Sequence, residues 1–182
     1  MGSNPIARAN MPFTPFHLGP SSFIGLLLFK FIDLPTFLIA SIIVDIEPFL
    51  VLFFNLDYPL HGFFHGFLGG SILAVITAII LYLLRNEVKK IMAFFKLSQE
   101  SSLKKILWSS FLGVYTHILL DASVYHFSLD SFSYQDILRP FYPFYGNPFF
   151  GWITLEQVYL FCNLSFLLGI LLYFIRLRNL KK

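Results

Sequence analysis

Two pairs of metal-ligating side chains stand out in the chain, each pair spaced four residues apart. His61 and His65 form the first pair, and His117 and Asp121 form the second. Residues four apart lie on one face of an α-helix, with their Cβ atoms about 5–6 Å from each other. Imidazole nitrogens and carboxylate oxygens are ligands that zinc and related divalent metals accept. The two pairs therefore predict a divalent-metal site.

Other interpretations of the same side chains stay open. The His61/His65 pair could be solvated at a membrane interface, and His117 with Asp121 could form a buried ion pair or a proton relay. His126 could serve in a helix–helix hydrogen bond, as polar residues in membrane helices often do. Asp57, Asp130 and Asp136 fall in the predicted outer loops, where we expect them to be solvated.

The composition indicates the environment in which these residues must be positioned. Of 182 residues, 57% are hydrophobic and 13% are charged, and the mean hydropathy is +0.72. Soluble domains contain about 25% charged residues, so the composition predicts an integral membrane protein. The net charge of +3 comes from Lys and Arg beside hydrophobic segments, which argues against nucleic acid as a partner. Cys162 is the single cysteine, which excludes an internal disulfide.

The hydropathy pattern predicts an all-α fold, a polytopic membrane helical bundle of about five hydrophobic segments. The segments cover residues 18–32, 35–54, 63–84, 106–125 and 152–175. The first is short for a span of about 20 residues, so the first two could form a short or re-entrant hairpin. Because a residue before proline disfavours the helical region, we expect the second to break near Glu47, before Pro48. Residues 1–10 are interpreted as a vector remnant or disordered lead, and 11–182 as one membrane domain.

The positions of the basic residues predict the orientation. Six lie between residues 85 and 105, and four more follow residue 175. Short cytoplasmic loops retain Lys and Arg, so we expect both regions, and the C-terminus, on the cytoplasmic side of a prokaryotic inner membrane. An odd number of crossings then places all five histidines toward the outer face.

Ionisable side chains in a membrane segment cost roughly 2.5–3.5 kcal/mol each on insertion scales, so they are usually paired or functional. The polar residues toward the outer ends of the segments therefore extend the predicted site. The predicted metal ligands are His17, Asp45, Glu47, His61, His65, His117 and Asp121. We expect one to three divalent ions, zinc being the first choice.

An aromatic loop, residues 126–151, connects the last two segments. Aromatic side chains favour the headgroup region of a bilayer, so we expect this loop at the interface. Within it, Arg139 is a cation whose guanidinium could grip a phosphate through two hydrogen bonds. The alternative is that Arg139 is an ordinary interfacial anchor.

Several motifs together resemble the small membrane-bound metal-dependent hydrolases, which are distantly similar to the zinc-dependent phospholipase C and single-strand nuclease superfamily. The motifs are Met11-Pro-Phe-Thr-Pro-Phe-His17, Val44-Asp45-Ile-Glu47-Pro48, Tyr58-Pro-Leu-His61-Gly-Phe-Phe-His65, Thr116-His117-Ile-Leu-Leu-Asp121 and Arg139-Pro-Phe-Tyr-Pro-Phe144 with Asn147-Pro-Phe-Phe-Gly151. The resemblance implies a helical scaffold whose His and Asp residues bind zinc and hydrolyse phosphodiesters. Many members have Arg and Thr where this chain has Gly62 and Phe64.

The sequence therefore predicts a metal-dependent hydrolase acting on a phosphoester in a lipid or lipid-linked substrate, with the lipid bilayer as its surroundings. Asp45 or Glu47 would take a proton from water and Arg139 would stabilise the phosphoryl oxygens. A divalent-metal transporter or metal-binding membrane protein is the main alternative, although the chain shows no internal repeat of the kind transporters carry. A structural membrane subunit is a third reading, which leaves the histidines unexplained.

Overall fold

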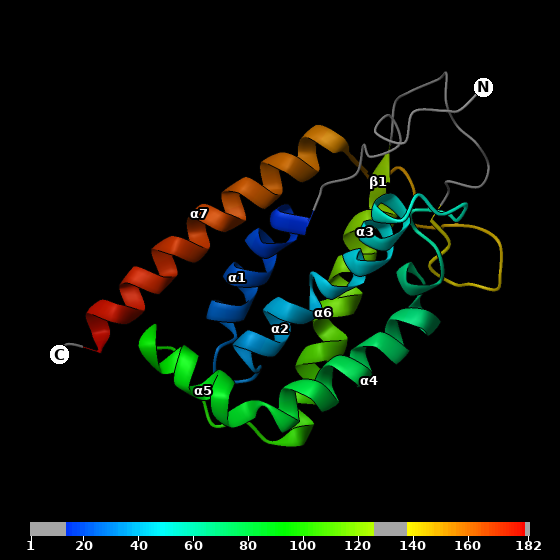
Figure 1. Ribbon diagram of the computed structural model, residues 1–182. Coiled ribbons are helices and arrows are strands. Elements are labelled where there is room, and N and C mark those ends of the chain that lie inside the picture. The colour runs from blue at the N-terminus through cyan, green and yellow to red at the C-terminus, as the bar shows by residue number, and fades with distance from the viewer. Residues whose placement is uncertain (1–13, 126–137, 181–182) are drawn as a thin grey trace.

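Helices make up most of the described chain, which covers residues 14–125 and 138–180 of a computed structural model (Figure 1). The α-helices are α1 (Leu18–Leu27), α2 (Leu34–Ala40), α3 (Ile46–Phe53), α4 (Phe67–Leu83), α5 (Arg85–Phe94), α6 (Leu103–Ser123) and α7 (Leu155–Asn179). Short 3-10 turns are η2 (Thr14–His17), η3 (Ile43–Asp45) and η4 (Phe63–His65). Strands β1 (Val124–Tyr125) and β2 (Ile153–Thr154) pair in parallel, with Val124 opposite Ile153. The helical fold class is confirmed.

Two segments of the described chain are long and apolar enough to cross a bilayer, against the five predicted. They are Leu34–Phe53, which joins α2, η3 and α3, and Leu155–Asn179, which is α7. A third results if α4 and α5 count as one span with a 76° bend between them, and α1 is a shorter apolar helix. Helix α6 covers most of the predicted fourth segment, but buried polar residues such as Ser109, His117 and Asp121 reduce its hydropathy.

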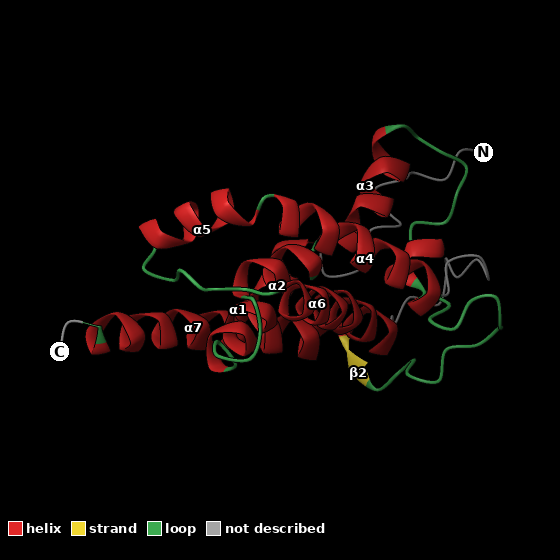
Figure 2. Ribbon diagram, turned by 90° about the horizontal axis from the view of Figure 1, so that it is seen from below, coloured by secondary structure: helices red, strands yellow, loops and turns green. Residues whose placement is uncertain are grey.

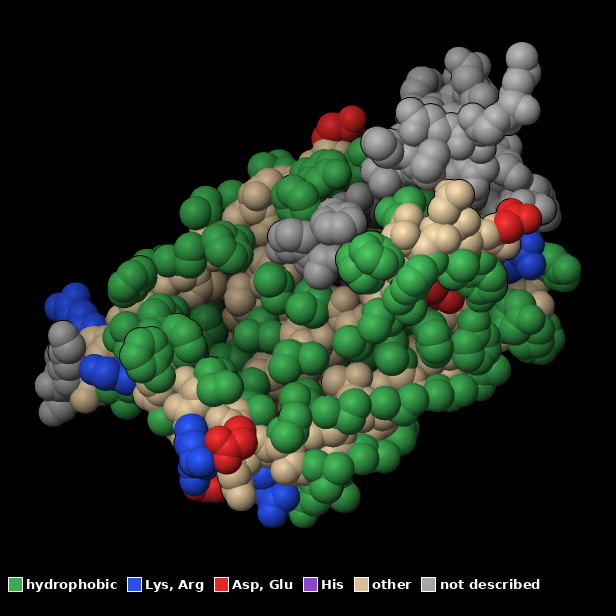
Figure 3. Space-filling model, in the orientation of Figure 1, with side chains coloured by type: hydrophobic (Ala, Val, Ile, Leu, Met, Phe, Trp, Pro, Cys, Tyr) green, Lys and Arg blue, Asp and Glu red, His purple; other side chains and the backbone are tan. Residues whose placement is uncertain are grey.

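Apolar side chains cover much of the outer surface (Figure 3). On α7, for example, Leu160, Leu167 and Phe174 are each about 60% exposed. Contiguous apolar surface of this extent is unfavourable in water and fits contact with lipid. The surface is therefore consistent with association with a membrane.

Helix caps fix where three of these elements begin. The Asp33 side chain accepts a hydrogen bond from the Thr36 amide and starts α2, with Pro35 in the first turn, where its missing N–H costs nothing. Ser102 caps α6 in the same way. At α7, Thr154 and Gln157 form a reciprocal capping box.

The break in the second apolar segment lies earlier than predicted. Helix α2 ends at Ala40 and η3 occupies Ile43–Asp45, so the turn falls before Asp45 and not at Glu47. Pro48 is tolerated because it lies in the first turn of α3. Because of this break, the Ser41 carbonyl is available to accept a hydrogen bond from a side chain of α6.

The core lies where α2, α4 and α6 meet. Its buried members, all but Leu73 either alanine or β-branched, are Ala40, Val44, Leu73, Ala74, Val114 and Ile118. Gly113 of α6 permits the closest approach, because a Cβ at that position would lie 2.7 Å from both the Ala40 Cβ and the Phe37 carbonyl oxygen. Tight contact between α2 and α6 is what positions the polar residues that follow.

Replacing Gly113 by valine is therefore expected to separate α6 from α2. Overpacking of this kind costs about 1–3 kcal/mol, so thermal unfolding of the purified variant should begin at a lower temperature than in the native protein. Leu119→Val, at an exposed position of the same helix, serves as the control and should change stability by less than about 0.5 kcal/mol. Equal losses in the two variants would contradict the packing described.

Candidate metal centre

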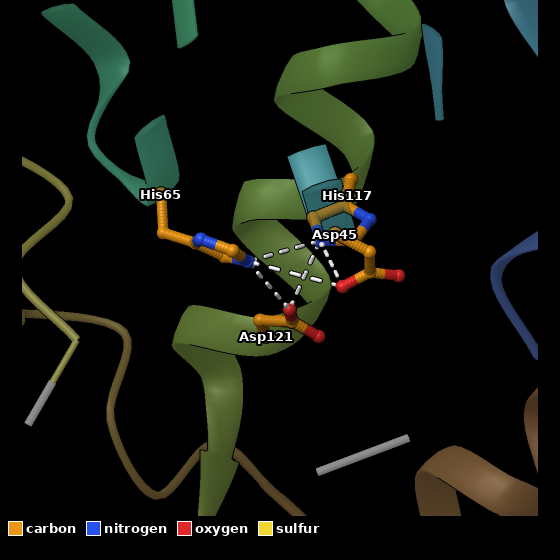
Figure 4. A group of neighbouring side chains, drawn as sticks. All are labelled: Asp45, His65, His117 and Asp121. Atoms are coloured by element: carbon orange, nitrogen blue, oxygen red, sulfur yellow. Dashed lines mark hydrogen bonds and ion pairs between the residues drawn. The ribbon is translucent and has the colours of Figure 1, made fainter. Parts of the chain in front are cut away.

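Four side chains from separate parts of the chain converge in the interior: Asp45, His65, His117 and Asp121 (Figure 4). Each contributes one ligand atom, and these four atoms all lie within 4.8 Å of one another. His65, His117 and Asp121 are buried, whereas the Asp45 side chain keeps 12% of its surface exposed. The set matches the donor chemistry expected of a zinc-type site, two imidazoles and two carboxylates.

Three elements deliver these side chains. Asp45 ends η3, His65 ends η4, and His117 and Asp121 lie one turn apart in the second half of α6. The second pair therefore uses a single helical face, as its spacing predicts. The first pair does not, because His61 precedes η4 and Gly62 has non-helical dihedrals (φ −92°, ψ −132°). Only His65 of that pair belongs to the four.

Hydrogen bonds on the outer side of each imidazole determine which nitrogen faces inward. The Ser41 carbonyl, which can only accept, lies 2.8 Å from Nδ1 of His117, so Nδ1 must carry the hydrogen. Nδ1 of His65 lies 2.9 Å from Oε2 of Glu47 and donates to that carboxylate. Both rings thus present Nε2 to the centre, where a neutral imidazole carries its lone pair. Metal-binding histidines are oriented by outer partners of this type.

Glu47 therefore occupies a position different from the predicted ligand or base. Besides the His65 ring, its carboxylate accepts hydrogen bonds from the backbone amides of Gly62 and Phe64, at 3.1 and 3.2 Å. Its oxygens are already used in holding η4 against α3. The geometry makes Glu47 a positioning residue for His65.

The inward-facing atoms crowd lone pairs together. The two Nε2 atoms lie 3.4 Å apart, and Oδ2 of Asp121 lies 3.1 Å from Nε2 of His117 and 3.8 Å from Nε2 of His65. Oδ1 of Asp45 lies 3.5 and 4.0 Å from the same two nitrogens. With metal–ligand bonds of about 2.0–2.1 Å, tetrahedral ligands stand roughly 3.3 Å apart. The observed separations suit one shared ion.

Hydrogen bonding and burial agree with a cation at this point. Among the described residues, the buried Oδ2 of Asp45 accepts no hydrogen bond, and the two buried oxygens of Asp121 lie 3.1 and 3.3 Å from imidazole nitrogens of His117 and His17. Buried carboxylates are costly unless they are paired or coordinate a metal.

Two further predicted ligands lie beside the four. His17 stacks on the His117 ring at 4.0 Å between centroids, and its Nε2 lies 3.3 Å from the other oxygen of Asp121, Oδ1. The His61 ring meets the His65 ring edge-on at 4.5 Å between centroids. His17 thus adjoins the second oxygen of Asp121, whereas His61 contacts the group through His65.

The remaining candidates lie on the loop or elsewhere. The Arg139 guanidinium stacks 4.5 Å from the centre of the Tyr145 ring, and the next residue, Pro140, accepts a hydrogen bond from the Phe67 amide beside η4. Cys162 is buried in a cluster with Val124 and Val158, so it belongs to the apolar core. His126, Asp130 and Asp136 lie outside the described residues.

Sequence reasoning missed the role of Ser41 entirely. It acts through its backbone carbonyl, and no side-chain pattern signals such a role. Comparisons with models of known protein families, with curated proteins and with solved structures find no match. The function must therefore be argued from the geometry of the site.

A divalent metal should bind the purified protein, and binding should depend on the four ligands. His117→Ala should weaken binding by at least roughly tenfold, since losing a ligand costs no less than losing an outer partner. His61→Ala is the matched control, because it removes a neighbouring imidazole outside the four. Elemental analysis after equilibrium dialysis measures both; equal metal contents in the native protein and His117→Ala would exclude the site.

The positioning role of Glu47 gives a second expectation. Glu47→Gln retains the shape but replaces the charged acceptor of the His65 Nδ1–H, and changes of this kind lower metal affinity about 10–100-fold. Competition with a chromogenic chelator measures the affinity. If Glu47→Gln bound metal as tightly as the native protein, the hydrogen bond from His65 would have no part in the site.

Proposed function

We propose that the protein is a membrane-embedded metal-dependent hydrolase of a phosphoester in a lipid or lipid-linked substrate. The observation that carries the proposal is the convergence of His65, His117, Asp45 and Asp121 on one point, with both imidazoles turned inward by fixed acceptors. A purely structural subunit gains nothing from burying two carboxylates beside two imidazoles, one of them with an oxygen, Oδ2 of Asp45, that accepts no hydrogen bond from the described residues. The resemblance of the sequence motifs to small membrane-bound hydrolases supports the same reading.

The four residues would hold one divalent ion of the zinc type, and His17 with Oδ1 of Asp121 marks a neighbouring place where a further ion could bind. Imidazole nitrogen and carboxylate oxygen are donors that zinc accepts. A divalent metal bound there supplies Lewis acidity, which lowers the pKa of water and polarises a phosphoryl oxygen.

Asp45 is the better of the two predicted bases. Its side chain is partly exposed, and its Oδ2 accepts no hydrogen bond from the described residues. Glu47 is committed to His65 and two amides. Asp45 would accept the proton of the attacking water at Oδ2, because its other oxygen, Oδ1, is the one that lies near the two Nε2 atoms.

Arg139 would stabilise the phosphoryl oxygens during the reaction. Its loop is anchored next to η4, through the hydrogen bond from Phe67 to Pro140. To grip a phosphate, the guanidinium would leave or share its stacking on Tyr145. Arg139 thus contributes to substrate binding and to charge stabilisation, not to metal binding.

The membrane arrangement extends the proposal. We place five hydrophobic segments in the bilayer, the first two as a hairpin, with the basic end of the molecule and the C-terminus in the cytoplasm of a prokaryote. The group of four then faces the outer leaflet, and a lipid substrate reaches it by lateral diffusion. Between it and the basic end lies the packed apolar core around Ala74 and Val114, which favours a hydrolase over a metal-conducting transporter.

Phosphodiesterase activity tests the proposal directly. The purified protein should hydrolyse a chromogenic phosphodiester or a phospholipid in mixed micelles, lose the activity on chelation and regain it with zinc. Asp45→Asn should lower kcat about 10²–10⁴-fold, as for a lost general base, and Arg139→Ala should lower it while leaving bound metal unchanged. Metal uptake into liposomes with no hydrolysis of either substrate would overturn the proposal in favour of transport.

A further inference from the structure

Helix α5 turns sharply away from the span that precedes it. It follows α4 after a single residue, Leu84, and the two helices are bent 76° from each other. If α4 crosses the membrane, α5 runs nearly parallel to the membrane plane. Figure 1 and Figure 2 show it along the end of the molecule that also carries the C-terminus of α7, away from η4 and β1. The basic residues between 85 and 105 had predicted a cytoplasmic loop at this stretch.

Two unlike faces run along α5. At about 100° per residue, Arg85, Asn86, Lys89, Lys90 and Ala93 fall on one side of the axis. Val88, Ile91, Met92 and Phe95 fall on the other, with Phe94 and Glu87 at its border. Val88 and Met92 pack against buried residues of the bundle. Ile91, Phe94 and Phe95 are 60%, 83% and 47% exposed. The rest of the described chain therefore leaves much of the surface of these three side chains uncovered.

This exposed apolar side continues the lipid-facing surface of α4. Ile76, Ile79, Ile80 and Leu83 of α4 are all exposed, and Leu84 at the bend is 50% exposed. The apolar surface therefore runs from a candidate span around the bend and onto α5. Continuity with the span is expected of a helix that lies at the edge of the same bilayer.

Positive charge concentrates around the helix. The basic residues at this end are Lys30, Arg85, Lys89, Lys90, Lys96, Lys104, Lys105, Arg176 and Arg178, against three acidic residues, Asp33, Glu87 and Glu100. Lys89 pairs with Glu100, and Lys90 with Glu87 at 2.8 Å, but all four side chains are largely exposed. Exposed pairs of this kind are weak, so they leave the lysines able to interact with other anions.

The protein holds α5 in this orientation. The chain reverses after Lys96, which has a positive φ of 57°, and Leu97 then packs with Phe29 and Leu34. Gln99 donates to the carbonyls of Phe29 and Ile32, and the Tyr173 hydroxyl of α7 donates to the Phe95 carbonyl. The helix is tied at its end to three other elements, so it does not swing freely.

We infer that α5 is an interfacial helix that seats this end of the protein on a leaflet rich in anionic lipid. Ile91, Phe94 and Phe95 lie at the acyl boundary, while Arg85, Lys89 and Lys90 reach the phosphates. Basic side chains have the length to bury their stems and keep their charge at the headgroups. An anionic leaflet offers acyl chains to the apolar face of α5 and phosphates to its basic face, so one partner suits both faces.

Spin labels at two neighbouring exposed positions test the placement. Ile91→Cys and Ala93→Cys lie about 160° apart around the helix, and each is made in a Cys162→Ala background and reconstituted in vesicles containing phosphatidylglycerol. We expect the label at 91 to collide with oxygen and avoid a water-soluble nickel complex, and the label at 93 to show the reverse. Equal exposure of both labels to nickel would place α5 in water, and protection of 91 from both reagents would indicate a protein contact; either result overturns the inference.

Lipid retention tests the charge. After detergent extraction, the native protein should retain phosphatidylglycerol in preference to phosphatidylcholine. Arg85→Gln/Lys89→Gln/Lys90→Gln should lower that preference about threefold or more, because each basic group near a surface attracts anionic lipid. The charge-conserving variant Arg85→Lys/Lys89→Arg/Lys90→Arg is the control and should leave it unchanged. An unaltered preference in the triple variant would also overturn the inference.

Discussion

The structure depends on the burial of four electron-rich groups at one point. Two imidazole nitrogens, 3.4 Å apart, face each other together with two carboxylates, and both rings have already committed their hydrogens to acceptors on the outside. Without a cation, the lone pairs repel one another in a medium that screens charge poorly. One divalent ion would remove that repulsion at all four side chains. On the proposed function, such an ion accounts for two carboxylates buried beside two imidazoles in the interior of an apolar protein.

The rest of the fold supplies this arrangement. The break after α2 brings the Ser41 carbonyl to His117, and the absence of a side chain at Gly113 lets α6 approach closely enough for that contact. On the other side, Glu47 holds the turn that carries His65. The two ends of the molecule then differ in character: the buried acidic and imidazole groups lie at one, and the basic residues around α5 lie at the other. A membrane accommodates that asymmetry, since its two surfaces need not present the same charge.

All four members of the group were among the predicted ligands, but spacing in the sequence explains the position of only one pair. His117 and Asp121 lie one turn apart on a regular helix, so their spacing alone placed them together. The same reasoning was wrong about a common helical face for His61 and His65, because Gly62 leaves the helical region between them. The role of Glu47 depends on how η4 approaches α3, and Ser41 acts through its backbone, so neither role has a local signal. Helix α5 did have a local signal in the sequence, because apolar residues at 88, 91, 92 and 95 have helical spacing. The lysines in the same stretch led to the prediction of a loop instead. The predicted bounds of the hydrophobic segments lie close to those of the observed helices. The number of membrane spans could not be predicted from hydropathy, because polar residues lie within α6.

X-ray absorption spectroscopy of the metal that remains with the purified protein tests the central claim most directly. A shared ion predicts a first shell of nitrogen and oxygen, with imidazole scattering from two rings and, for zinc, distances of about 2.0–2.1 Å. In His65→Ala the imidazole contribution should fall by half. A spectrum of a fully hydrated ion, or a sulfur shell contributed by Cys162, would contradict the account.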